Sequence, residues 1–274
     1  MKKLITVLAL AVLVLAGCSS SKDTNTFTVG LECDYAPYNW TTTEDKKSDY
    51  SVLVDGSKAA YCDGYDVRIA GEIAKDLGKT LVIKKISWDG LIPAVQSGEI
   101  DAIIAGMAPT AERKQTISFS DAYFEDQPIQ GIMVQSTSEL ANATSLNDFS
   151  NKKIAAQLGT LQERLIKQIP NGVATTSLDS YGALMQSLQS GTIDGYAVEA
   201  VVGEQQIAET PGLTFITFAN GGGFVIEPED STTAIGVKKD SVALLDSINA
   251  ALGKINADQR NTWMKEAASK SDSE

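Results

Sequence analysis

One segment of this chain occurs twice, and this repetition constrains the fold more than any other feature of the sequence. Residues 90–106 (GLIPAVQSGEIDAIIAG) align without a gap to residues 183–199 (ALMQSLQSGTIDGYAVE), at an offset of 93. Each copy has the pattern of an amphipathic helix that ends at a glycine and is followed by a buried strand. The repeat predicts two lobes built from the same unit, although two amphipathic segments can also resemble each other by chance.

Helical and strand patterns alternate through the first half of the chain. Apolar residues at helical or alternating spacing, bounded by glycines, define each element. The expected elements are strands at 27–32, 80–86 and 100–106 and helices at 64–79 and 89–98. This alternation predicts an α/β fold with a largely parallel sheet.

The carboxyl ends of the repeated strands are candidate ligand-binding positions. In open α/β sheets, ligands bind beyond the carboxyl ends of the strands. Those ends are Gly106 in the first copy and Glu199 in the second. Two lobes that face each other across these edges would enclose a cleft, with a carboxylate on one side.

Arg113 stands where a helix normally disfavours a cation. Thr110 is a typical N-cap residue, so Arg113 falls in the first turn, where the helix dipole is positive. Either the long side chain points into water, or it binds an anion in front of the helix. Together with Glu199, the second interpretation favours a small molecule that carries a carboxylate and an ammonium, such as an α-amino acid.

The composition excludes several classes of function. The sequence has no histidine, which excludes Ser-His-Asp and Cys-His catalysis and every zinc site that contains histidine. The formal net charge of −12, which becomes −14 once Lys2 and Lys3 leave with a signal peptide, argues against a nucleic-acid ligand. We expect no cofactor and no metal site.

The first 26 residues are excluded from the fold. Two lysines, an apolar run and small residues indicate a secretory signal peptide at 1–17. The stretch LAGC resembles a bacterial lipobox, and this resemblance implies cleavage before Cys18 and lipid attachment to its sulfur. Residues 18–26 are expected to form a flexible tether. Ordinary secretion with an unmodified cysteine is the alternative.

Cys33 and Cys62 remain after the cysteine of the lipobox. A pair of cysteines in an exported chain favours a disulfide, which would hold down the polar segment between them. Two separate buried thiols are the alternative.

Several stretches together resemble the extracytoplasmic substrate-binding proteins of amino-acid ABC importers, the bacterial solute-binding proteins of family 3. They are DYAPYNW, GYDVRIAGEIAKDLG, WDGLIPAVQSGEIDAIIAGMAPTAERKQTISFSDAYF, AAQLGTLQE and SGTIDGYAVE. The resemblance implies the two-lobed, type II periplasmic-binding-protein fold with two hinge-crossing strands. It places lobe 1 at 27–127 plus 233–274 and lobe 2 at 128–232.

The resemblance also assigns contacts to the common part of an amino acid. Arg113 matches the arginine that pairs with the ligand α-carboxylate, and Thr160 matches a turn residue that caps the same group. Gly106 and Glu199 match positions that bind the α-amino group, through the backbone and the side chain respectively. Ala108 matches a position that is often serine or threonine, so here only its backbone can serve.

The remaining assignments concern the ligand side chain. Tyr35 and Trp88 match ring positions that sandwich it, and Glu32 matches an acid that faces its distal end in relatives that bind basic amino acids. Gln157 and Gln162 border the same pocket. An acid with two rings is the composition of a cation site, so we expect arginine or lysine as the ligand, with glutamine, histidine and cystine as alternatives.

The resemblance implies a monomeric, lipid-anchored protein that binds a free L-amino acid with high affinity outside the cytoplasm. It would deliver the ligand to the membrane permease and ATPase subunits of an ABC importer. One alternative is a dehydratase-like enzyme on the same fold, with Glu32 and Glu199 as an acid–base pair. Another is a ligand-sensing module, which would add a transmembrane helix and a signalling domain after the lobes, and the residues up to Glu274 contain neither.

Overall fold

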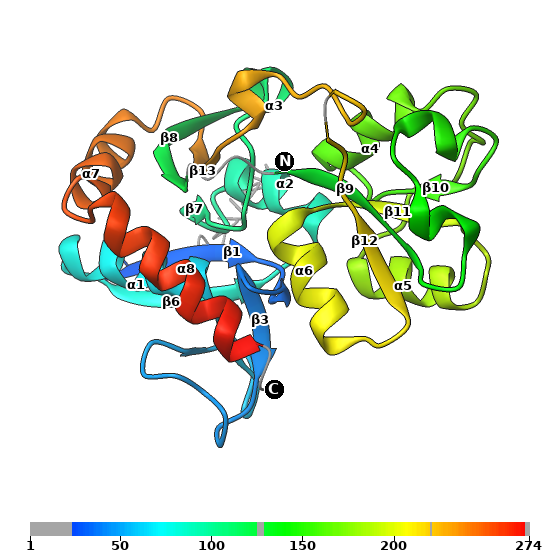
Figure 1. The fold of residues 1–274 in the computed structure, drawn as a ribbon. Helices are drawn as coiled ribbons and strands as arrows, with labels where there is room; N and C mark the ends of the chain where they lie inside the picture. Colours follow the sequence, from blue (N-terminus) through cyan, green and yellow to red (C-terminus); the bar gives the residue numbers. More distant parts are fainter. Residues whose placement is uncertain (1–23, 125–128, 220, 272–274) are drawn as a thin grey trace, which may run out of the picture.

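Two α/β lobes lie side by side in the computed structural model of the chain, which describes residues 24–124, 129–219 and 221–271 (Figure 1). The predicted signal peptide at 1–17, the lipidation site Cys18 and most of the predicted tether at 18–26 lie outside the described residues and stay predictions.

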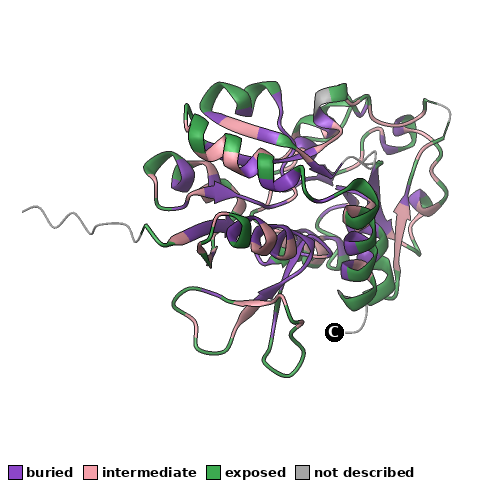
Figure 2. Cartoon of the chain, turned by 90° about the vertical axis from the view of Figure 1, so that its left-hand side faces the viewer, coloured by how far each residue is buried: buried purple, intermediate pink, exposed green. Residues whose placement is uncertain are grey.

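A five-stranded sheet forms the centre of the first lobe, with the order β6-β1-β7-β13-β8. Its strands are β1 (Thr26–Leu31), β6 (Thr80–Lys85), β7 (Ala102–Ile103), β8 (Ile117–Phe124) and β13 (Thr233–Lys238). The helices of this lobe are α1 (Tyr65–Asp76), α2 (Trp88–Ser97), α3 (Ala111–Thr116), α7 (Val242–Leu252) and α8 (Ala257–Ser271). Figure 2 shows the resulting layers, with buried strands inside and helices that are exposed on their outer faces.

A four-stranded sheet with the order β10-β11-β9-β12 forms the centre of the second lobe. Its strands are β9 (Gln130–Gln135), β10 (Ile154–Ala155), β11 (Gly195–Glu199) and β12 (Leu213–Ile216). The α-helices are α4 (Leu161–Leu165), α5 (Tyr181–Gln189) and α6 (Ala200–Glu209). Short 3-10 helices are η1 (Glu139–Asn142), η2 (Leu146–Phe149) and η3 (Ile166–Gln168), and η4 (Pro228–Asp230) lies on the way back to the first lobe.

The chain passes between the two sheets twice, from β8 to β9 and from η4 to β13. Residues 125–128, in the first passage, lie outside the described residues. The predicted lobe boundaries, 27–127 plus 233–274 and 128–232, and the hinge role of the two passages stay predictions.

The repeated sequence unit is also a repeated structural unit. The two helices of the unit, α2 and α5, are each followed by a glycine in the left-handed region, Gly98 at φ 79° and Gly191 at φ 74°. The carboxylate of Asp101 then accepts a hydrogen bond from the backbone N–H of Thr28 at 2.8 Å, and that of Asp194 accepts one from the N–H of Lys153 at 2.7 Å. The aspartate of the shared Ile-Asp therefore forms a hydrogen bond from the same kind of turn to the neighbouring part of the sheet in each lobe.

The prediction of a largely parallel sheet is confirmed for the three strands on which it was based, β1, β6 and β7, and is wrong for the strands that complete the sheets. Only the pairs β1–β6, β1–β7 and β10–β11 are parallel among the described strands. The strands next to the passages between lobes, β8, β9 and β13, form antiparallel pairs. Alternation of helices and strands along a sequence does not reveal the direction of a strand that enters a sheet from the other lobe.

The predicted strand at 100–106 is much shorter in the structure. Only Ala102–Ile103 forms the strand β7. Gly106 has φ +60° and donates its N–H to the hydroxyl of Tyr123 at 2.9 Å. Beyond Ile103, isolated backbone hydrogen bonds still reach neighbouring strands, from the N–H of Ile104 to the carbonyl of Gly30 and from the N–H of Ala234 to that of Met107. The regular strand ends because at Gly106 the backbone turns and bonds to a side chain instead.

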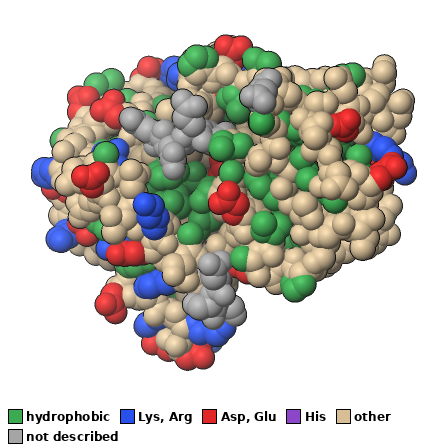
Figure 3. Space-filling model, viewed as in Figure 1, with side chains coloured by type: hydrophobic (Ala, Val, Ile, Leu, Met, Phe, Trp, Pro, Cys, Tyr) green, Lys and Arg blue, Asp and Glu red, His purple; other side chains and the backbone are tan. Residues whose placement is uncertain are grey.

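A third, small sheet with the order β2-β3-β5-β4 belongs to a segment that projects from the first lobe (Figures 1 and 2). Its strands are β2 (Asp34–Tyr35), β3 (Asn39–Thr42), β4 (Val52–Leu53) and β5 (Tyr61–Asp63). We call residues 34–63 the projecting segment. On the face shown in Figure 3, charged side chains gather at its tip and over the first lobe, while the second lobe shows few.

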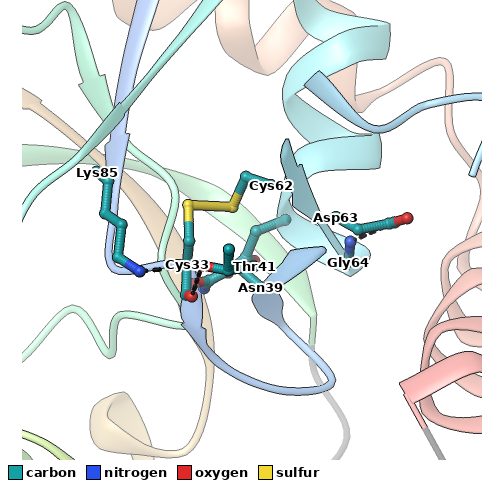
Figure 4. Close-up of a disulfide and its surroundings, with 8 residues drawn as sticks. Cys33, Asn39, Thr41, Cys62, Asp63, Gly64 and Lys85 are labelled. Atoms are coloured by element: carbon teal, nitrogen blue, oxygen red, sulfur yellow. Dashed lines mark hydrogen bonds between the residues drawn. A yellow bond between two sulfur atoms is a disulfide. The ribbon is translucent and has the colours of Figure 1, made fainter. Parts of the chain in front are cut away.

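The predicted pairing of Cys33 with Cys62 is present as a disulfide at the base of the projecting segment (Figure 4). Both cysteines are buried, and Cys33 has φ +49°, a conformation that residues other than glycine rarely adopt. The hydroxyl of Thr41 donates to the carbonyl of Cys33 at 2.8 Å and accepts from Lys85 at 2.9 Å. The base of the segment is thus held by a covalent bond and by hydrogen bonds.

None of the helices among residues 24–124, 129–219 and 221–271 is long and apolar enough to cross a membrane.

Replacing both cysteines tests the contribution of the disulfide. In the chain-entropy model, cross-linking two cysteines 29 residues apart adds about 3–4 kcal/mol to the free energy of unfolding. We therefore expect Cys33→Ser with Cys62→Ser to lower the urea midpoint of a chain that begins after Cys18. Reduced wild type is the control and should unfold at the midpoint of the double variant. Equal midpoints for oxidised and reduced wild type would contradict the expectation.

Candidate ligand-binding cleft

A cavity of about 460 Å³, its open mouth included, lies between the two lobes. Every residue predicted from the sequence to contact a ligand lines this one cavity: Glu32, Tyr35, Trp88, Gly106, Ala108, Arg113, Gln157, Thr160, Gln162 and Glu199. The structure therefore brings the whole predicted set together; whether these residues bind a ligand stays a proposal.

Arg113 is buried in this cavity and does not point into water. It lies in the first turn of α3, and its backbone N–H donates to the hydroxyl of the N-cap Thr110 at 3.3 Å. The residue is 8% exposed, and its guanidinium donates to the carbonyl of Ala108 at 2.9 Å and to that of Gly159, in the other lobe, at 3.0 Å. No carboxylate of the described residues forms an ion pair with it, and burial lowers the pKa of Arg113 to about 10.

The surroundings of Arg113 leave it able to bind an anion. A guanidinium has five N–H donors in a planar fork, and two of them are used by the carbonyls of Ala108 and Gly159. The guanidinium carbon lies 5.1 Å from the ring centre of Trp88, which covers part of its surface. The remaining donors can bind a carboxylate that enters the cavity.

Glu199, at the end of β11, is a buried acid of the second lobe that lines the same cavity as this arginine. Its carboxylate accepts a hydrogen bond from the hydroxyl of Tyr35 at 2.8 Å and another from Tyr38. Burial raises the pKa of Glu199 to about 7, and the two tyrosine hydrogen bonds oppose this rise. A cation beside Glu199 would favour its ionised form.

Glu32, at the end of β1, forms a second buried acidic position. The side-chain amide of Gln157, from the other lobe, donates to its carboxylate at 2.7 Å. Burial raises the pKa of Glu32 to about 7, while the hydrogen bond from Gln157 lowers it. Two acids of the cavity thus titrate near neutral pH.

Gly106 presents a backbone turn at the carboxyl end of β7. Its N–H already donates to Tyr123, whose hydroxyl donates to the buried carboxylate of Asp66 at 2.7 Å. A side chain at this position would meet the ring of Tyr35 at 3.1 Å. The carbonyl oxygen of Gly106 is therefore the group that it can offer to a ligand.

Two other residues that were predicted to contact a ligand already form hydrogen bonds within the protein. The carbonyl of Ala108 accepts from the guanidinium of Arg113 and from the N–H of Thr110. The hydroxyl of Thr160 donates to the carbonyl of Gln157 at 2.7 Å and accepts from the N–H of Glu163 as the N-cap of α4. The backbone N–H of Thr160 also donates to the carbonyl of Gln157, at 3.4 Å, so both residues mainly shape the cavity.

The two lobes touch each other around the cavity, so the structure is a closed form. Besides the contacts of Arg113 and Glu32, the indole N–H of Trp88 donates to the carbonyl of Gly159 at 3.1 Å. The ring of Tyr35 stacks on Tyr38 in its own lobe and on Tyr181 in the other, with ring centres 5.4 and 5.2 Å apart. These stacks use ring surface of Tyr35 that the resemblance assigns to the ligand side chain.

Several residues that line the cavity were not predicted from the sequence: Gln130, Leu161, Tyr181, Asp230, Thr232 and Thr233. A signal existed for Tyr181, because the offset of 93 relates it to Trp88, and each is the first residue of its helix. Asp230 and the two threonines come from the passage that returns to the first lobe, where no sequence pattern marks a site.

No group of three or more Asp, Glu or Cys side chains among the described residues is arranged to hold a metal ion.

The sequence matches a family model over residues 27–267, that of the bacterial extracellular solute-binding proteins, family 3. Among similar proteins, the arginine-binding extracellular protein ArtP of Bacillus subtilis is 29% identical over 264 residues, which cover 92% of each chain. A probable histidine-binding protein of Campylobacter jejuni is 32% identical and matches 81% of this chain and 84% of its own.

Solved structures show the same fold. The amino-acid ABC transporter substrate-binding protein AbpA of Streptococcus pneumoniae, bound to L-arginine, superposes with a TM-score of 0.76 at 28% sequence identity, over 90% of this chain and 96% of its own. The two-lobed, type II periplasmic-binding-protein fold expected from the sequence is therefore confirmed. With a family model matched over nearly its whole length, the chain belongs to the bacterial extracellular solute-binding proteins of family 3.

Proposed function

We propose that this protein binds a free L-amino acid outside the cytoplasm and delivers it, unchanged, to the permease of an ABC importer. The observation that carries this proposal is the presence of a buried cation, Arg113, and a buried acid, Glu199, in one cavity between two lobes. An α-amino acid has a carboxylate and an ammonium two bonds apart in the same small unit, and so complements both. Relatives named as arginine-binding and histidine-binding proteins support it.

In this proposal Arg113 forms a bidentate, charge-assisted pair with the α-carboxylate. The α-ammonium binds the carboxylate of Glu199 and the carbonyl oxygen of Gly106. The ring of Trp88 and the pair of Glu32 with Gln157 border the space left for the side chain.

The charges of the cavity favour a basic side chain. Three carboxylates, those of Glu32, Glu199 and Asp230, line it together with one cation, Arg113, while Arg164 pairs with Asp230. Once the two charged groups of the amino acid backbone pair with Arg113 and Glu199, the carboxylate of Glu32 has no cationic partner. Arginine or lysine would supply one, whereas glutamine, histidine or cystine would be accommodated by protonated Glu32.

The expected lipid anchor at Cys18, with the tether at 18–26, would keep a monomeric protein at the outer face of the membrane near its permease. Both features are part of the proposal, and they rest on the resemblance of LAGC to a lipobox.

A thermal-shift panel of the common amino acids tests the proposed ligand class. A ligand at about 100 times its dissociation constant adds about 2.7 kcal/mol to the free energy of unfolding, so the best ligand should raise Tm clearly. We expect L-arginine or L-lysine to give the largest shift and to be recovered unaltered from the complex. Chemical conversion of the ligand, or no shift with any amino acid, would contradict the proposal.

Removing the guanidinium of Arg113 should abolish most of the affinity. Truncating one partner of a buried charge pair costs at least about 2 kcal/mol, or roughly thirtyfold in Kd. We expect Arg113→Ala to fold and to bind at least thirtyfold more weakly in calorimetric titration, and Arg113→Lys to rescue only in part because an ammonium lacks the fork. Arg68→Ala removes an arginine outside the cavity and is the control. Binding by a folded Arg113→Ala within threefold of wild type would mean that this site is wrong.

The affinity for a cationic amino acid should rise with pH between about 5.5 and 8. The ligand needs ionised Glu32 and Glu199, and burial raises the pKa of each to about 7 in the ligand-free cavity. Without ligand, the stability of the protein should instead fall as the pH rises. The pKa of each acid is higher in the folded than in the unfolded chain, so the stability that these groups contribute is lost as the pH rises through about 7. Calorimetry and melting curves at both pH values measure the two effects. Glu199→Gln is the matched variant and should weaken both effects, leaving the part that Glu32 contributes, whereas an affinity that falls with pH would contradict the assignment.

A further inference from the structure

Asp230 holds a buried oxygen that the structure leaves without a partner. The residue ends η4, on the passage back to the first lobe, and is 2% exposed. Its Oδ2 forms an ion pair with Arg164, but its Oδ1 has no hydrogen-bond partner. Of the three such buried side-chain atoms among the described residues, on Asn39, Tyr50 and Asp230, only that of Asp230 belongs to a residue that lines the cavity.

Buried acceptors in proteins are nearly always hydrogen-bonded, because an unpaired one loses its interaction with water and gains nothing in return. The ion pair with Arg164 fixes the orientation of the carboxylate, so Oδ1 cannot simply turn toward solvent. A ligand in the cavity would supply the hydrogen-bond donor that Oδ1 of Asp230 lacks.

The position of Asp230 indicates which donor this is. Asp230 and Arg113 line the same cavity, and the charge of Asp230 is the one that most favours the protonated form of Arg113, so the two groups lie near each other. In an amino acid, the donor next to the α-carboxylate is the α-ammonium. An ammonium has three N–H donors, and Glu199 with the carbonyl of Gly106 accounts for two.

We propose that Oδ1 of Asp230 accepts the third hydrogen bond of the ligand α-ammonium, which makes Asp230 a determinant of selectivity for α-amino acids. The assignment rests on the proposed function, and it adds a contact from the passage between the lobes to contacts from the two lobes themselves. Ligands without an α-amino group would leave Oδ1 buried and unpaired, and the site would reject them.

The test combines a change in the protein with a change in the ligand. Asp230→Asn keeps the shape of the side chain and removes its charge. Calorimetric titrations use L-arginine and L-glutamine, together with 5-guanidinopentanoate and 4-carbamoylbutanoate, which are the same molecules without the α-amino group. Arg164→Gln breaks the ion pair but retains the carboxylate of Asp230, and Asp246→Asn removes an exposed acid outside the cavity as the control for net charge.

We expect Asp230→Asn to lower the affinity for the amino acid that wild type binds by about tenfold to a hundredfold, the effect of a hydrogen bond to a charged group. Its affinity for the corresponding deamino analogue should change by less than threefold. Arg164→Gln should lose less than Asp230→Asn, and Asp246→Asn should bind as wild type does. Melting curves without ligand establish that each variant is folded.

The outcomes separate this assignment from the proposed function. If wild type binds neither amino acid, the proposed function fails and the assignment falls with it. If wild type binds but a folded Asp230→Asn binds within threefold, only the assignment is overturned. Equal losses for the amino acid and its analogue would overturn the contact with the α-ammonium, and an equal loss in Arg164→Gln would assign the effect to the ion pair instead.

Discussion

A buried guanidinium requires hydrogen-bond acceptors, and Arg113 finds one in each lobe. Its bonds to Ala108 and Gly159 join α3 of the first lobe to the turn before α4 of the second. The other contacts around the cavity, between Glu32 and Gln157 and between Tyr35 and Glu199, also join one lobe to the other. The closed arrangement thus satisfies charged and polar groups that an open cleft would expose to water, and a bound zwitterion would share the same groups.

The repeat in the sequence explains how much of the site could be predicted. Its offset relates Gly106 to Glu199 and Trp88 to Tyr181, and all four residues line the cavity. The ends of strands and the first residues of helices are set by local patterns, so a sequence reveals them. Arg113 could also be recognised from a local pattern, because a cation in the first turn of a helix conflicts with the helix dipole.

The features that the sequence did not reveal depend on the way the chain passes between lobes. The antiparallel direction of β13 follows from its return out of the second lobe, which no local pattern records. Asp230 lies on that passage, and its partner Arg164 is far away in the sequence. The turn at Gly106 has a similar cause, since its N–H donates to Tyr123, whose hydroxyl donates to Asp66, and both partners lie on other elements.

Because of the disulfide at its base, the projecting segment can change in length without a change in the geometry of the cleft. Cys33 follows Glu32 directly, and Cys62 lies just before the start of α1, so both ends are fixed where the segment joins the lobe. Residues inserted at the exposed tip, around 44–49, would lengthen a closed loop without moving its anchors. The tip is accordingly the natural attachment point for a fluorescent reporter or an affinity tag in a sensor built from this protein.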